Sequence, residues 1–300
     1  MNASSSRRLP EPITEQPPHR PGGETDKNRA RATRHLGAVF FCGCTLLITA
    51  PAQGQEARDF CPDRPGLGTP ACTLEPGVVM VELGAAEWTR ESDSTTRSDT
   101  IATGDLLVRL GVTPQLEAQI GWGGYAHVRE RDRATGARSS DDGVGDLTLA
   151  LRRNLANPDG SGFSIALMPY ATLPIGNTPA GAGDWGAGLL IPISYALAGD
   201  IALALTPEVN AAPDSDSNGR HLAYGAVIGV EFPLHDAVTG TLELAVTHDR
   251  DPDGHSTETL AAFSLGWQPA DDWQIDAGSS FGLNHDSPDF TLSLGVARRF

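Results

Sequence analysis

Two acidic segments of the chain carry an oxygen-bearing side chain at every second position and end in glycine. They contain Asp214, Asp216 and Asn218 in one case and Asp249, Asp251 and Asp253 in the other. This spacing matches the first half of a calcium-binding loop, in which alternate carboxylates converge on one hard cation. An EF-hand is excluded, because Gly225 and Leu260 stand where the closing glutamate is required. Calcium binding is one hypothesis beside a solvated acidic loop, and a titration with millimolar calcium that gave no heat would contradict it.

Serine and histidine could form the nucleophile and base of a barrel-type lipid hydrolase, which needs the two side chains on adjacent strands. The candidate pairs are His248 with Ser264 and His255 with Ser256, and no recognisable motif surrounds either pair. The only lysine is Lys27. The chain beyond it can therefore form neither a P-loop nor a Schiff base. We expect no enzymatic activity and no cofactor.

A third group of candidate residues consists of isolated charges at alternate positions within apolar segments. They are Glu82, Arg109, Glu117, Arg152, Glu208, Glu231, Glu243 and Asp276. If the apolar rows face lipid, these charges face a lumen, since a charge on the lipid face costs roughly 2–4 kcal/mol at the midplane. Two hypotheses follow. The lumen is either a mildly cation-selective pore or solute-binding site, or a network of paired charges that closes a small barrel.

The elements that would position these residues are strands. From Val78 onward, segments of about ten residues alternate apolar and polar side chains, as transmembrane strands do. In the last segment, for example, Leu292 and Leu294 flank Ser293. An even number of antiparallel strands places both barrel ends on one side, which is periplasmic in bacterial outer-membrane barrels. About twelve strands are predicted, at 78–89, 99–112, 115–128, 145–154, 163–173, 185–196, 201–210, 221–232, 238–248, 257–268, 273–282 and 290–300.

The connections between these segments alternate in length. The short ones lie at 113–114, 196–200, 235–237 and 269–272. The longer polar ones lie around 90–98, 129–144, 174–184, 211–220, 249–256 and 283–289. Tight periplasmic turns and longer external loops produce this alternation in outer-membrane barrels. A soluble all-β sandwich has no reason to sort its loops in this way, so the pattern favours the barrel.

Composition excludes two further classes of protein. Beyond residue 50, no run of about 18 apolar residues offers a membrane-spanning helix. The formal net charge is −16. Without the seven basic and four acidic residues before Gln53, 15 basic and 34 acidic residues remain, a charge of −19. Such a surface repels phosphate backbones, so we expect no nucleic-acid partner.

The beginning of the chain carries the features of a secretory signal. A basic flank up to Arg34 precedes an apolar run from Leu36 to Ile48, and a small-residue cleavage site ends at Ala52. A membrane anchor is the alternative, but the apolar run is shorter than the ~17 residues of a span. We therefore interpret 1–52 as an N-terminal extension and signal peptide.

Two cysteines remain after the predicted signal is removed, since Cys42 and Cys44 lie within its apolar run. Cys61 and Cys72 form an even pair in an oxidising compartment, which predicts one disulfide. The residues between them are rich in proline and glycine and do not fit regular structure. The prediction is a disulfide-stapled periplasmic lead-in at 53–77, followed by the outer-membrane barrel at 78–300.

Four stretches of the chain resemble a known family, the outer-membrane transporter-like barrels named for the meta-pathway of phenol degradation. They are CPDRPG (61–66) with TPACTLEPG (69–77), GVGDL (143–147), PYATLPIG (169–176), and DAGSSFGLN (276–284) with the terminal Arg299-Phe300. The resemblance extends over roughly 61–300. It implies an outer-membrane barrel involved in the passage of small solutes, aromatic or hydrophobic ones among them. The terminal Phe300 also resembles the aromatic signal that the barrel-assembly machinery reads.

Together these features predict an all-β transmembrane barrel in the bacterial outer membrane, with lipid, the barrel-assembly machinery and a small solute as partners. The predicted function is passage or binding of that solute. The alternative is a closed-lumen barrel with an envelope-structural or surface-binding role. Steady single-channel steps in a planar bilayer would support the pore, and silence over a wide voltage range would favour the closed barrel.

Overall fold

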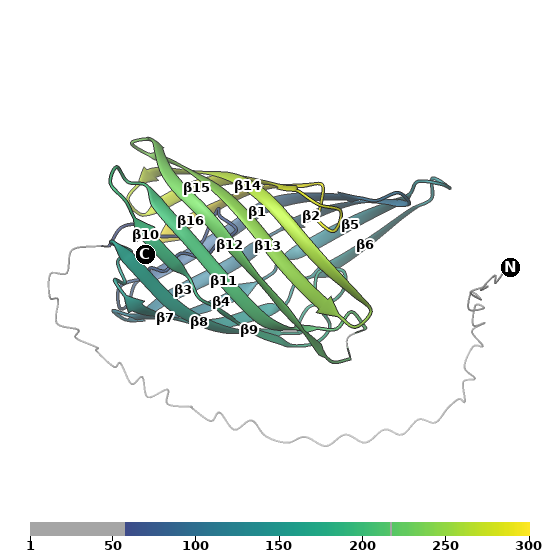
Figure 1. The fold of residues 1–300 in the computed structure, drawn as a ribbon, viewed down its shortest axis with the longest axis horizontal. Helices are drawn as coiled ribbons and strands as arrows, with labels where there is room; N and C mark the ends of the chain where they lie inside the picture. Colours follow the sequence, from purple (N-terminus) through teal and green to yellow (C-terminus); the bar gives the residue numbers. More distant parts are fainter. Residues whose placement is uncertain (1–57, 217) are drawn as a thin grey trace, which may run out of the picture. The chain divides into compact units, whose positions relative to one another are not determined.

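The barrel is described by a computed structural model that covers residues 58–216 and 218–300. The predicted export segment at 1–52 lies outside these residues. The strands form one antiparallel sheet, and pairing of β1 with β16 closes it into a barrel (Figure 1). Among the described residues, no helix is long and apolar enough to cross a membrane.

Twelve strand positions make up the barrel wall, which confirms the predicted strand number. One position is shared by β9 and β10, which lie end to end and both pair with β8 and β11. The wall contains β1 (Val79–Ser92), β3 (Asp105–Thr113), β4 (Leu116–Trp122), β7 (Leu147–Ala156), β8 (Phe163–Leu173), β9 (Gly186–Leu190), β10 (Ile193–Ala196), β11 (Ala202–Pro213), β12 (Arg220–His235), β13 (Val238–Asp251), β14 (Gly254–Ala270), β15 (Trp273–Gly282) and β16 (Phe290–Arg299).

Side-chain alternation assigns the two faces of the wall. Leu110, Leu149 and Leu244 point outward, with exposed fractions of 43, 43 and 51%. Their neighbours in sequence point inward, and Arg109 is fully buried. Exposed apolar rows on the outside and buried polar groups on the inside are the inverse of a soluble protein and the rule for a barrel in lipid. The strand phase predicted from the sequence is thereby confirmed.

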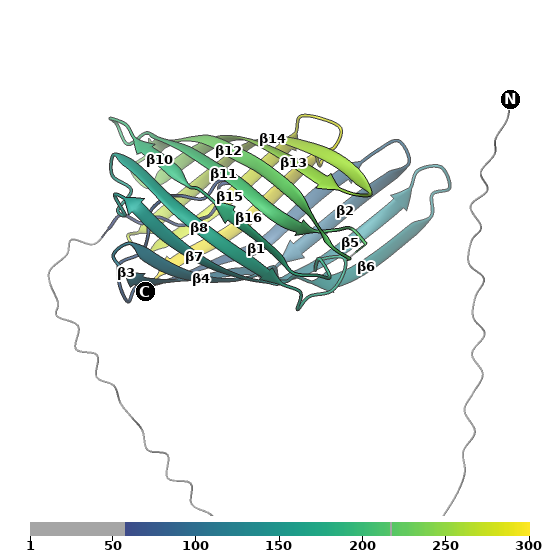
Figure 2. The same cartoon turned by 60° about the horizontal axis from the view of Figure 1, so that its bottom comes forward.

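Three further strands extend the sheet beyond the barrel wall. They are β2 (Thr96–Thr103), β5 (Tyr125–Asp132) and β6 (Arg138–Val144), which pair in the order β1–β2–β5–β6. Figures 1 and 2 show them projecting from one end of the barrel. Each of the predicted strands 99–112 and 115–128 therefore corresponds to two strands, β2 with β3 and β4 with β5. Much of the predicted loop 129–144 is also strand.

Glycines cause these breaks. Gly104 separates β2 from β3 at φ 77°, and Gly124 precedes β5 at φ 64°. Both values lie in the left-handed region that only glycine adopts at little cost. A Cβ at Gly124 would also lie 2.4 Å from the carbonyl oxygen of Thr103. The sheet therefore bends along a line across neighbouring strands, which the period-2 pattern does not reveal.

The connections at the two barrel ends differ, although less than predicted. The expected loop 249–256 is almost all strand, with only Pro252 and Asp253 between β13 and β14. Strand pairing continues there because a hairpin needs as few as two turn residues. At the opposite end, the Phe300 N–H donates to Val79 O at 2.7 Å, so both ends of the barrel chain lie together. That this end is periplasmic stays a prediction.

Candidate functional site

The N-terminal plug, residues 58–77, contacts lumen-facing side chains of strands all around the barrel. Its backbone and side chains bond to residues of β1, β3, β4, β7, β11, β13 and β15. The described part of the expected lead-in thus bonds to lumen-facing side chains of the wall, and its periplasmic placement stays a prediction. The physical reason is that a segment rich in proline and glycine cannot pair as a strand, and lumenal charges satisfy its backbone groups instead.

A buried charge network anchors the base of the plug. Arg109 donates to Glu117 Oε1 from Nε at 2.8 Å and to Glu82 Oε1 from Nη1 at 3.0 Å. Arg152 Nη2 bonds to Asp63 Oδ2 of the plug at 2.5 Å, and Asp63 Oδ1 lies 2.9 Å from Arg109 Nη1. The side chains of both arginines are fully buried. Because each guanidinium faces carboxylates at short range, the cost of removing these ions from water is offset by pairing.

Lumenal carboxylates also accept backbone N–H groups of the plug. Glu82 accepts from the N–H groups of Asp63 and Arg64 at 3.0 and 2.9 Å. Glu243, on β13, accepts from those of Leu67 and Gly68 at 2.7 and 2.8 Å. Hydrogen bonds to ionised acceptors are stronger than those between neutral groups, so these contacts fix the plug at two places on the barrel wall, β1 and β13.

The side chain of Arg64 reaches from the plug to a third strand of the barrel wall, β15. Its Nη2 lies 3.2 Å from Asp276 Oδ1 on β15. The guanidinium lies over Gly84 of β1 and Gly295 of β16, which face each other in the register. A Cβ built on Gly295 would lie 2.3 Å from Arg64 Nε. The two glycines therefore make the room in which this arginine reaches its carboxylate.

The remaining two predicted lumen residues, Glu208 and Glu231, lie away from the plug network. Glu208 accepts a hydrogen bond from Tyr170 on β8 and another from Asn210 Nδ2 at 3.3 Å. Glu231 is exposed and lines a cavity of about 230 Å³ between the plug and the wall. The structure thus joins six of the eight predicted charges to the plug. Glu208 bonds to other wall residues, and Glu231 borders a cavity.

Three cavities surround the plug. The cavity of about 230 Å³ is bounded by the plug and by β10 to β13, with Ala202, Ala204 and Glu231 on the wall side. Two smaller cavities, of about 130 and 180 Å³, share Arg64, Glu87 and Ser293 in their linings. Small side chains predominate around them, so the lumen is narrowed by the plug more than by the wall.

The predicted disulfide between Cys61 and Cys72 is confirmed. It closes the part of the plug that carries Asp63 and Arg64. Cys61 O accepts from Arg109 Nη1 at 2.8 Å and Cys72 O from Arg152 Nη1 at 3.2 Å. Each half of the staple is therefore tied to one arginine of the buried network.

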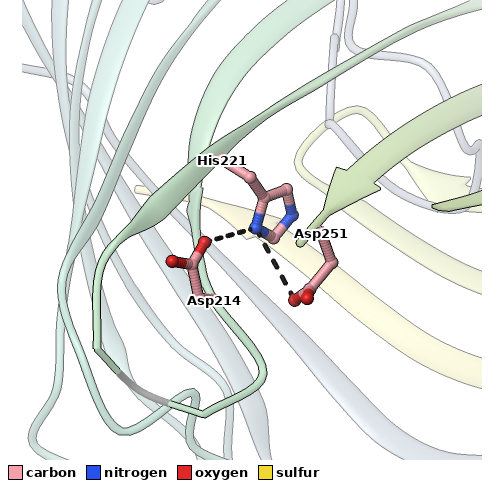
Figure 3. Close-up of side chains that lie close together, drawn as sticks. All are labelled: Asp214, His221 and Asp251. Atoms are coloured by element: carbon pink, nitrogen blue, oxygen red, sulfur yellow. Dashed lines mark hydrogen bonds and ion pairs between the residues drawn. The ribbon is translucent and has the colours of Figure 1, made fainter. Parts of the chain in front are cut away.

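The two acidic segments predicted as calcium loops lie side by side and share a histidine that the sequence pattern did not single out. His221 Nδ1 lies 2.9 Å from Asp214 Oδ1 and 3.7 Å from Asp251 Oδ2 (Figure 3). Asp249 Oδ1 is 2.8 Å from His221 Nε2, but off the line of a hydrogen bond, so Nε2 has no well-aligned acceptor. Asp214, His221 and Asp251 could together hold a metal ion. Calcium favours an all-oxygen shell, and its binding here stays a prediction.

Asp216, Asn218 and Asp253 do not join these ligand atoms. Asp216 Oδ1 accepts from the backbone N–H of Asn218 at 2.9 Å, and Asp253 Oδ2 accepts from Ser215 at 3.2 Å. They shape the turns of the two segments instead.

Neither proposed serine–histidine pair is assembled. Ser264 lies opposite Thr241 on β13, whereas His248 lies opposite Thr257, so seven residues of strand separate the two side chains. At about 3.4 Å per residue this is more than 20 Å. His248 Nδ1 instead lies 2.9 Å from Thr257 Oγ1. His255 and Ser256 are consecutive on β14 and point to opposite faces.

Residues 62–300 match the family model described as "Putative MetA-pathway of phenol degradation". The chain belongs to this family. The family assignment covers the plug from Pro62 onward together with the whole barrel, in agreement with the resemblance seen in the sequence. No curated protein sequence matches the chain significantly.

Two solved structures are similar to the chain. An outer membrane channel from Pseudomonas putida F1 superposes with a TM-score of 0.62 at 18% identity, covering 79% of this chain and 99% of the channel. The translocator domain of the autotransporter NalP from Neisseria meningitidis gives a TM-score of 0.46 at 13% identity, covering 75 and 88% of the two chains. The first likeness shows that this family member has the fold of an outer-membrane barrel.

The sequence did not identify the plug residues that complete the family member's lumen. Asp63 and Arg64 were seen only as part of a loop, and Gln274, whose Nε2 donates to Arg64 O at 3.1 Å, was not considered. The available signal was the charged pair within CPDRPG, since charges in a stapled loop need partners. The eight predicted lumenal charges gave the second signal, because buried charges also need partners and none had been assigned to them.

Proposed function

We propose that the barrel passes small, weakly polar solutes, aromatic ones among them, across the outer membrane along the plug. The observation that carries this proposal is the cavity of about 230 Å³ between the plug and strands β10 to β13. A cavity of about 150 Å³ is enough to hold benzene. A single substituted ring therefore fits beside the plug without displacing it.

The lining of this cavity suits a ring with a polar substituent. Phe60 and Pro70 of the plug face Ala204 of the wall, and they form an apolar surface. Glu231 and Glu243 border the same space. A phenolic hydroxyl could donate to Glu231, whose carboxylate has no partner among the described residues, while the ring contacts the apolar side.

Two similarities support a transport role. The family description names a pathway of phenol degradation, and the solved barrel from Pseudomonas putida F1 is named an outer membrane channel. We propose further that the chain has no catalytic activity, since its candidate serine–histidine pairs lie apart. Its assembly would depend on the barrel-assembly machinery through the terminal aromatic residue.

Phenol flux into vesicles that contain the refolded protein tests the proposal. Ala204→Phe fills the cavity and is expected to reduce the flux severalfold. Leu203→Phe places the same ring one residue away on the lipid face, where Leu203 is 47% exposed, and should leave the flux unchanged. Equal flux through both variants would show that the solute does not use this cavity.

Conductance separates the proposal from a closed barrel. In a planar bilayer, the refolded protein is expected to give small, steady single-channel steps, because the plug leaves only narrow spaces. Silence over a wide voltage range, together with vesicles no more permeable to phenol than protein-free ones, would favour the envelope-structural alternative.

A further inference from the structure

The outer face of the extension formed by β2, β5 and β6 concentrates positive charge in an acidic protein. In the register, Arg97 lies opposite Arg131, which lies opposite Arg138, so that three arginines form one row across three strands. A second row, two residues closer to the barrel, contains Asp99 and Arg129. With Arg90, these arginines are five of the 15 that follow Gln53. We call them the arginine face.

Most of this charge is not neutralised within the chain. Asp99 lies 2.9 Å from Arg90 Nε and 3.0 Å from Arg97 Nη2, so one carboxylate serves two guanidinium groups. Neither Arg131 nor Arg138 forms an ion pair among the described residues. Like charges directly opposite each other destabilise a sheet. An anion bound between the rows would remove this repulsion.

The arginine face surrounds a hollow. An open depression of about 470 Å³ is lined by Arg97, Asp99, Arg129, Glu130, Arg131, Arg138, Ser139 and Ser140. Guanidinium groups bind phosphate oxygens with two parallel hydrogen bonds, which makes arginine the preferred residue for such groups. The depression is large enough for a phosphorylated sugar.

Pairing with the barrel wall shows that this face looks toward lipid. Arg97 and Asp99 share a strand face with Ile101, which lies opposite Trp88 of β1. Trp88 in turn lies opposite Leu292, a member of the outward apolar row of β16. The arginine face is therefore a continuation of the lipid-facing surface and not of the lumen.

An aromatic pair marks the membrane boundary just below the arginines. Trp88 and Phe290 pack edge to face at 5.0 Å between ring centroids, and Arg90 lies 4.8 Å from the Trp88 ring. Aromatic girdles lie at the interface between hydrocarbon and headgroups. Measured from Ile101, the row of Asp99 lies about 7 Å and the row of Arg97 about 13 Å further along the strand. Because strands tilt by about 40° to the membrane normal, these distances correspond to about 5 and 10 Å along the normal, above the level of the aromatic pair. This is the depth of lipid headgroups.

We propose that the arginine face binds the phosphate-bearing headgroup of a lipid in the membrane leaflet at this end of the barrel. If the first and last strands of the barrel have their chain ends on the periplasmic side, as predicted, this leaflet is the outer one. The ligand is then a phosphorylated glycolipid. The site is separate from the lumen and does not depend on which solute crosses it. It gives the acidic barrel a fixed point of attachment in an anionic leaflet.

The test is titration of the refolded full chain in neutral detergent with diphosphoryl lipid A, followed by tryptophan fluorescence. Saturable binding that weakens with added salt is expected. The double variant R131Q/R138Q should bind at least tenfold more weakly. R131K/R138K keeps the charge but not the paired hydrogen bonds and should fall between the two. The matched control is R153Q, because Arg153 is an exposed arginine at the other end of the barrel.

Several outcomes would overturn the proposal. They are equal affinities of the parent chain and R131Q/R138Q, equal binding of a lipid A preparation without phosphate, and stronger binding of phosphatidylglycerol than of lipid A. Displacement of lipid A by micromolar inorganic phosphate would assign the site to a free anion instead. Each variant is first shown to keep the mobility shift of the unheated, folded barrel on a gel, so that loss of binding is not loss of fold.

Discussion

Glu117 is the residue on which the buried network depends most. Its carboxylate accepts from Arg109 Nε and Nη2 at 2.8 and 3.0 Å, and it accepts the backbone N–H of Leu74 in the plug at 3.0 Å. Arg152 Nη1 lies 3.8 Å away. All of these side chains are inaccessible to water. If one charged group of the network is removed, water therefore cannot solvate the partner that remains.

Glu117→Gln is expected to reduce the free energy of unfolding by about 3 kcal/mol, because the buried Arg109 and Arg152 lose one of the three carboxylates that face them. Urea unfolding in detergent, followed by tryptophan fluorescence, measures the change. Glu231→Gln is the control, since Glu231 is exposed and should change stability by less than about 1 kcal/mol. Similar losses for the two variants would mean that the network does not stabilise the fold.

Gly295→Ala tests the passage of Arg64 across the lumen. The added Cβ would lie 2.3 Å from Arg64 Nε, so the guanidinium must leave Asp276. Overpacking of this kind costs about 1–3 kcal/mol, and the loosened plug should raise single-channel conductance. Gly254→Ala, where a Cβ meets nothing within 4 Å, should change neither quantity. Unchanged conductance in Gly295→Ala would show that the position of Arg64 does not limit passage through the lumen.

At the scale of elements, the plug is held by two different kinds of constraint. Hydrogen bonds and ion pairs attach it to the wall, and the disulfide restricts its own conformations. Closing a loop of this length contributes about 3 kcal/mol in a chain-entropy estimate. The second constraint can be removed without touching the first.

The double variant Cys61→Ser/Cys72→Ser should therefore fold into the barrel but hold its plug less firmly. Trypsin is expected to cleave after Arg58 faster in the variant than in the parent chain, as read by mass spectrometry. Arg133, in the turn between β5 and β6, provides the internal control, because its cleavage should proceed at the same rate in both proteins. Equal protection of the plug would show that the wall contacts alone are sufficient.

The barrel wall could be predicted from the sequence because the alternation of apolar and polar residues in each strand shows which side chains face lipid and which face the lumen. Leu110 and Arg109 differ in polarity, and a slip of one residue would exchange them between lipid and lumen. Eight lumenal charges were predicted on this basis, and all belong to the barrel strands. Their alternation requires no knowledge of which strands are neighbours.

The plug and the bends could not be predicted in the same way. A loop such as 61–72 has no period, so nothing in its pattern indicates whether it lies outside the barrel or within it. Its position depends on lumenal partners such as Glu243, 175 residues away from Gly68. The break at Gly104 likewise depends on backbone geometry and not on polarity, and His221 joins two acidic segments only after β12 and β13 pair.

At the scale of the whole molecule, closure of the barrel depends on the pairing of its first and last strands. Ten register pairs join β1 to β16, with one bulge between Gly84 and Ala86. The last residue completes this seam, since the N–H of Phe300 donates to Val79 O and its own carbonyl accepts from Val79 N at 3.3 Å. The backbone of Phe300 thus closes the barrel, while its ring is 64% exposed.

Phe300→Ala separates the role of the ring from that of the backbone. The substitution keeps both seam hydrogen bonds and removes an exposed ring, so the stability of the refolded barrel should change by about 0.5 kcal/mol or less. If the ring is the signal for the assembly machinery, the amount of folded protein in the outer-membrane fraction of cells should fall severalfold. Phe281→Ala is the matched control, because Phe281 is a 51% exposed phenylalanine within β15 and not at the chain end. Equal amounts of the two variants in that fraction would contradict a targeting role, and a large loss of stability in Phe300→Ala would make the ring a structural contact.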